Sequence, residues 1–79
     1  MSKEQKQLLY EVATWHNKKF HIAMKDVWDD SDFAYDRECT ERIRNLESEY
    51  TEKYGALPEW KYIDHVWATI KTLKEELGV

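Results

Sequence analysis

Residues that interrupt helices occupy only three positions in this chain. Its one proline is Pro58, and its two glycines are Gly55 and Gly78. Glycine readily takes the left-handed conformation that ends a helix, and proline suits the first helical turn. We therefore interpret Gly55 and Gly78 as helix ends and Pro58 as a helix start, which leaves long segments free to be helical throughout.

Apolar residues recur with helical spacing in three segments, and we predict helices over about 3–28, 32–54 and 58–77. At the start of the first, Ser2 is the expected N-cap, with Gln5 reaching back in a capping box. The expected inward faces are Leu8, Leu9, Val12, Ala13, His16, Phe20, Ala23, Met24 and Val27; then Tyr35, Cys39, Ile43, Leu46, Tyr50 and Tyr54; then Trp60, Ile63, Val66, Trp67, Ile70, Leu73 and Leu77. The second face is narrow and the third is broad.

The predicted first helix raises a problem of length. A helix of about 26 residues is about 39 Å long, which exceeds the diameter of a compact domain of this size. Phe20, Ile22 and Met24 also alternate with the period of a strand, so a break after Asn17 is an alternative. We predict an all-α, three-helix antiparallel bundle over residues 1–79 that is extended, and a dimer is an open possibility.

The composition suits a single cytoplasmic domain. A chain of 79 residues buries only about 60 to 65% of its unfolded surface, and its four Trp and five Tyr supply apolar area from few positions. Cys39 is the one cysteine, so no internal disulfide is expected, and the sequence has no signal-peptide pattern. Its apolar runs are far shorter than the roughly 20 residues that span a bilayer. We expect a cytoplasmic protein with no membrane segment.

No motif with the spacing of a catalytic, cofactor or metal site is present. His16 lies on the first apolar face, and a half-buried imidazole can act as a base, a pH switch or a metal ligand. No second ligand stands one helical turn away, so we interpret His16 as a core histidine with one hydrogen bond. Cys39 is interpreted as a small apolar core residue. We expect no cofactor, no metal and no enzymatic activity.

Four residues at the edges of the apolar faces are candidates for binding a partner. Trp15 and Ile22 lie seven residues apart in the first segment, as do Trp60 and Trp67 in the third. Such residues either complete a thin core or form a protein-binding patch, because Trp and Tyr are favoured anchors at interfaces. These four positions are our predicted aromatic binding face.

An acidic cluster forms the second candidate surface. Asp29, Asp30, Asp32 and Asp36 fall within eight residues, and residues 29–54 hold nine acidic against four basic side chains. The aspartates can cap the second helix at a turn. Alternatively, carboxylates along a helix can imitate nucleic-acid phosphates. The sequence lacks the central glycine and closing glutamate of an EF-hand.

These observations favour a small non-catalytic protein-interaction module, regulatory or inhibitory, that binds a protein partner or forms a homodimer through an aromatic helical face. The alternative is an acidic, nucleic-acid-mimicking inhibitor of a nucleic-acid enzyme, of the anti-defence type that phages and other mobile elements use. A third hypothesis is an enzyme or metal protein that uses His16. The net charge of −4 argues against direct binding of nucleic acid.

Overall fold

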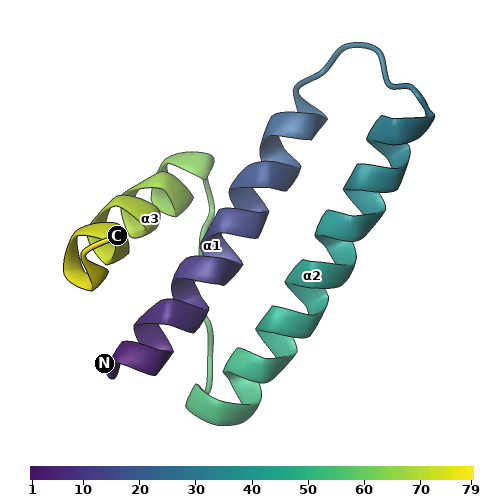
Figure 1. Cartoon of the computed structure of the whole chain (residues 1–79). Helices are drawn as coiled ribbons and strands as arrows, with labels where there is room; N and C mark the ends of the chain where they lie inside the picture. The colour runs from purple at the N-terminus through teal and green to yellow at the C-terminus, as the bar shows by residue number, and fades with distance from the viewer.

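The computed structural model describes residues 1–79 and is entirely helical (Figure 1). Its three helices are α1, Lys3–Ala23, α2, Asp30–Tyr54, and α3, Ile63–Leu77. Both α2 and α3 contact α1, which gives a helical bundle in which α1 is the shared element. The prediction of an all-α, three-helix fold is confirmed.

Helix α1 is shorter than predicted. It is continuous past Asn17, so the alternative break there is wrong, but it ends at Ala23 and not at residue 28. Met24 and Val27 were expected on the inward face, but their side chains are exposed to solvent. Residues 24–29 instead form the loop to α2, because Asp29 must adopt an extended backbone to cap that helix.

Helix α2 begins two residues earlier than predicted, with Asp29 as its N-cap. The Asp29 side chain accepts a hydrogen bond from the backbone N–H of Asp32, and the Asp32 side chain accepts one from the backbone N–H of Asp29. A capping box is thus present here.

At the start of α1, the Ser2 side chain accepts a hydrogen bond from the backbone N–H of Gln5, as expected. The Gln5 side chain does not bond back to the cap; it donates to the hydroxyl of Tyr50, 3.0 Å away.

Helix α3 begins at Ile63, so the predicted start at Pro58 is wrong. Residues 55–62 form a non-helical connector that leads from the end of α2 along α1 to α3 (Figure 1). Gly55 does end α2, with φ 94° and ψ −152°, whereas Gly78 ends α3 in the expected left-handed conformation. The chain needs this connector because the backbone of α3 lies beside α1 and not beside α2.

The core is centred on adjacent residues of α1. Leu8 lines a hollow with Glu49 and Lys53 of α2, and Leu9 lines another with Leu73 of α3. The central cluster joins all three helices through Leu8, Leu9, Tyr50 and Leu73. Partly buried apolar residues surround it, namely Tyr10, Leu46, Tyr54, Leu57 and Trp60. One helix thus supplies apolar surface to two neighbours.

The molecule is elongated and its core is small. Its extents are 40 × 24 × 24 Å, and its radius of gyration is 13.3 Å, against about 11.6 Å for a compact chain of this length. Ten of 79 residues are buried, and 5645 Å² of surface is accessible, against about 5,100 Å² for a typical protein of this mass. None of the helices combines the length and apolar character needed to cross a membrane.

Truncating the core on the α3 side of α1 should destabilise the fold markedly. Leu9 is 3% exposed, so Leu9→Ala should lower the free energy of unfolding by about 2 to 4 kcal/mol through lost burial and a residual cavity. Urea denaturation followed by circular dichroism measures this change. The control Val27→Ala, at a side chain 81% exposed, should shift it by less than about 0.5 kcal/mol. Equal effects of both substitutions would contradict the packing described.

Candidate functional site

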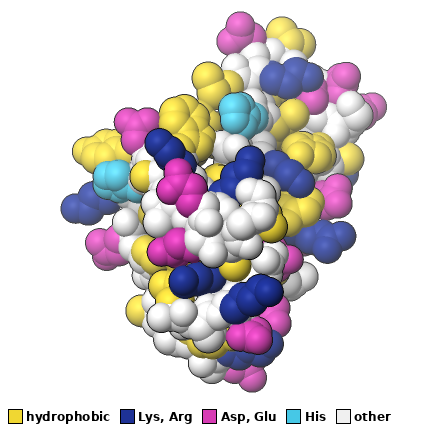
Figure 2. Space-filling view, turned by 60° about the vertical axis from the view of Figure 1, so that its left-hand side comes forward, with side chains coloured by type: hydrophobic (Ala, Val, Ile, Leu, Met, Phe, Trp, Pro, Cys, Tyr) yellow, Lys and Arg dark blue, Asp and Glu magenta, His cyan; other side chains and the backbone are white.

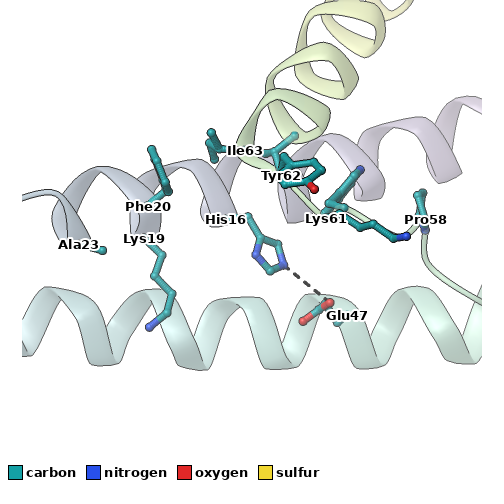
Figure 3. A pocket seen from close by; sticks show the side chains of 11 residues that line it. His16, Lys19, Phe20, Ala23, Glu47, Pro58, Lys61, Tyr62 and Ile63 are labelled. Atoms are coloured by element: carbon teal, nitrogen blue, oxygen red, sulfur yellow. Dashed lines mark ion pairs between the residues drawn. The ribbon is translucent and has the colours of Figure 1, made fainter.

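The largest hollow of the surface is an open groove bounded by α1, α2, the connector and the start of α3 (Figure 3). Its volume is about 560 Å³. The residues that line it are His16, Lys19, Phe20, Ala23, Glu47, Pro58, Trp60, Lys61, Tyr62, Ile63 and Val66. Aromatic and basic side chains therefore share one concave surface, which we call the aromatic groove.

His16 points from α1 toward Glu47 of α2 at the floor of the aromatic groove (Figure 3). Its Nε2 atom lies 3.7 Å from a carboxylate oxygen of Glu47, is itself buried and makes no hydrogen bond. The ring also meets Trp60 edge to face at 5.5 Å between centroids. His16 is half-buried, as expected, but its Nε2 atom lacks the hydrogen bond that a core histidine usually makes.

Glu47 is a site residue that the sequence analysis missed. Spacing along one helix detects partners three or four residues away, and Glu47 lies on a different helix from His16. The pair alone does not make a metal centre, because no group of three or more His, Cys, Asp or Glu side chains converges in the structure. Structural metal sites in proteins usually use four ligands.

No activated nucleophile lies near this pair. Cys39 is fully buried on α2, and burial raises the pKa of its thiol above the ordinary value, which disfavours the reactive thiolate. Lys19 is held by Asp36 at 2.9 Å and by the hydroxyl of Thr40 at 2.8 Å. The groove consequently offers apolar and aromatic contact area more than it offers a reacting group.

The predicted aromatic residues divide between two sides of α1. Trp60 donates from Nε1 to the hydroxyl of Thr69, and Trp67 donates to the side-chain oxygen of Asn17 on α1. Trp67 also meets Phe20 edge to face at 6.2 Å between centroids. Both tryptophans therefore lie against the side of α1 that faces α3.

Trp15 and Ile22 do not lie with Trp60 and Trp67 on the side of α1 that faces α3. The Trp15 ring contacts the charged groups of Lys18, 4.2 Å from its centroid, and Arg42 of α2, 5.6 Å away. It lines a separate small hollow between α1 and α2. Ile22 is half-buried in the last turn of α1. The four residues thus do not form one continuous aromatic stripe.

Three of the four clustered aspartates have contacts within the chain. Asp29 and Asp32 form the capping box, and Lys25 pairs with Asp32 at 2.9 Å. Asp36 pairs with Lys19 at 2.9 Å. Only Asp30 is exposed without a side-chain hydrogen bond or ion pair. The cluster therefore closes the turn between α1 and α2 and begins α2.

Comparison with known proteins gives no relative for this chain. No protein-family model, no curated protein and no solved structure matches it.

The capping aspartate should make stability depend on pH in the acid range. Hydrogen bonds from the Ser31 hydroxyl and the Asp32 backbone lower the pKa of Asp29 below its ordinary value of 3.8. A lowered carboxyl pKa stabilises the fold above that value, and this contribution disappears as the pH falls through the folded-state pKa. Asparagine still caps but does not titrate, so Asp29→Asn should lose less stability between about pH 5 and pH 2.

Urea denaturation at each pH measures this slope. Asp26→Asn is the matched control, because Asp26 lies in the same loop without a side-chain hydrogen bond, and its profile should follow that of the unchanged protein. If the free energy of unfolding of Asp29→Asn fell with pH as steeply as that of the control, the lowered pKa of Asp29 would be contradicted.

His16 should contribute to stability through its packing. His16→Ala removes the edge contact with Trp60, so the free energy of unfolding should fall by about 1 to 2 kcal/mol. His65→Ala, at an exposed position of α3 where the ring's edge contact is with the exposed Tyr62, should change it by less than about 0.5 kcal/mol. Thermal and urea melts of both variants measure the difference, and an unchanged His16→Ala melt would instead leave His16 free for a chemical role.

Proposed function

We propose that this chain is a small protein-interaction module, regulatory or inhibitory, that binds through the α1–α3 aromatic face. That face comprises Phe20, Trp60, Tyr62 and Trp67 around the aromatic groove. The observation that carries the proposal is the exposure of two large aromatic side chains there, Tyr62 at 69% and Trp67 at 43%. Aromatic residues beside a concave surface are typical anchors of protein interfaces.

The packing of the bundle supports the same proposal. Helices α2 and α3 both pack on α1, their backbones stay apart, and the aromatic groove opens where the connector bridges them. A chain that buries only ten residues gains stability when a partner covers further apolar surface. An amphipathic helix is one kind of partner that uses such a groove.

Self-association is part of this proposal. We infer an antiparallel course for the helices, a cytoplasmic setting and a homodimer as the simplest assembly. The apolar face that a second copy covers would then be the α1–α3 face, since a two-fold interface brings the same surface of each subunit together.

The acidic inhibitor is the weaker candidate. An acidic mimic needs carboxylates that remain available to a basic groove. Asp29, Asp32 and Asp36 are engaged in capping and ion pairs, which leaves Asp30 as the uncommitted member of the cluster. The aromatic face therefore has the stronger support of the two.

Light scattering across a wide range of protein concentration tests the proposal. We expect a mass above that of a monomer at high concentration, or a monomer that forms a stoichiometric complex with a protein recovered on it from native cells. Trp67→Ala should weaken either association by about tenfold or more, as loss of a tryptophan anchor does.

Tyr35→Ala is the matched control, because Tyr35 is an exposed aromatic residue on α2, away from this face. It should leave the association unchanged. A monomer at every concentration with no recovered complex, or equal effects of both substitutions, would overturn the proposal.

A further inference from the structure

A second exposed apolar surface lies at the end of the molecule where α1 and α2 are joined. Met24 and Val27 of the loop are 64% and 81% exposed, and Phe33 in the first turn of α2 is 55% exposed. Trp28 packs edge to face on Phe33, with 5.1 Å between ring centroids. We call Met24, Val27, Trp28 and Phe33 the tip patch. It is separate from the aromatic groove, none of whose lining residues it includes.

Exposure of these side chains has a local cause. The capping box holds Asp29 in an extended conformation at the start of α2, and Lys25 donates hydrogen bonds to both carboxylate oxygens of Asp32 at 2.9 Å. The neighbouring apolar residues Met24 and Val27 are consequently left facing solvent. A group of exposed apolar residues close together on the surface is typical of an interaction site.

Carboxylates are concentrated in the sequence that carries the tip patch. Residues 24–36 contain five aspartates and one lysine. Lys25 and Lys19 pair with Asp32 and Asp36, so Asp26, Asp29 and Asp30 keep charges that no salt bridge balances. Figure 2 shows hydrophobic and acidic side chains side by side at this end of the molecule, at the top of the view.

The negative charge near the tip patch indicates which kind of partner can bind there. In a two-fold dimer through the tip, the unbalanced aspartates of both copies would face each other, and like charges brought together oppose binding. Anionic membrane surfaces and nucleic acids are repelled for the same reason. A positively charged protein segment is attracted, and it can bury apolar side chains on the patch.

We propose that the tip patch docks a basic protein segment that carries large apolar anchors, with the apolar side chains on Met24, Val27 and Phe33 and the lysines or arginines beside Asp26 and Asp30. This site goes beyond the aromatic face and does not depend on it. The chemistry differs from phosphate mimicry, because apolar burial and carboxylates act together.

A peptide titration followed by two-dimensional NMR of the full chain tests the proposal. The probe is a short synthetic amphipathic peptide of lysine and leucine. Two matched peptides replace every leucine by serine or every lysine by glutamate. The lysine–leucine peptide should shift the amide signals of residues 24–33 and the indole signal of Trp28, and each replacement should weaken binding.

Two pairs of substitutions separate charge from apolar contact. Asp26→Asn with Asp30→Asn removes two charges that make no hydrogen bond within the chain, and should weaken binding by about fivefold. Met24→Ser with Val27→Ser removes exposed apolar groups and should weaken it by at least as much. Circular dichroism should show unchanged helicity for both.

Matched controls lie away from the tip. Glu52→Gln with Glu75→Gln removes the same charge from exposed positions, and Val79→Ser removes an exposed apolar group. Both should bind like the unchanged chain, and so should Trp67→Ala, which separates this site from the aromatic face.

Four results would overturn the proposal. They are signal changes that spare residues 24–33, equal binding by the glutamate peptide, tip variants that bind like the controls, and tip signals that move with protein concentration or with lipid vesicles in place of the peptide. The concentration effect would assign the patch to a second copy, and the vesicle effect to a membrane.

Discussion

The fold depends on one helix that packs on two sides. The buried residues of α1 come in adjacent pairs, Leu8 with Leu9 and Val12 with Ala13. Neighbouring residues of a helix point about 100° apart, so each pair provides apolar surface in two directions. Helix α2 covers one side and α3 the other, and the backbones of α2 and α3 do not approach each other closely. The elongated shape, the thin core and the open aromatic groove all follow from this arrangement.

Polar contacts determine where the two longer helices meet. Gln5 bonds Tyr50 near one end, and Lys19 binds Asp36 and Thr40 toward the other. Beyond them, the Asp29 and Asp32 capping box closes the hairpin loop. The clustered aspartates thus act first as structural groups, and their remaining charge gives the tip patch its acidic surroundings. One short stretch of sequence therefore both starts a helix and defines a surface.

The sequence predicted part of the aromatic face but not the tip patch. Exposed Trp67 and half-buried Trp60 follow from their places at the edge of an apolar face. Glu47 beside His16 was not predictable, since a contact between two helices depends on how their faces are turned. The tip patch was also missed, because Met24 and Val27 continue the apolar period of α1 and were assigned to its core. Periodicity predicts which residues share a face, but not whether another element covers that face.

The sequence alone determined the number of helices, the apolar stripe of α2 from Cys39 to Tyr54 but not the exposed Tyr35, the cap at Ser2, and the ends of α2 and α3 at Gly55 and Gly78. These features depend on residues close together in the chain, so local spacing and backbone preference suffice. Only the tertiary structure decided that α1 stops at Ala23 and that α3 starts at Ile63. Both boundaries arise because the chain must leave its helical path for α2 and α3 to pack on two different sides of α1. Those contacts join residues that are distant in the sequence.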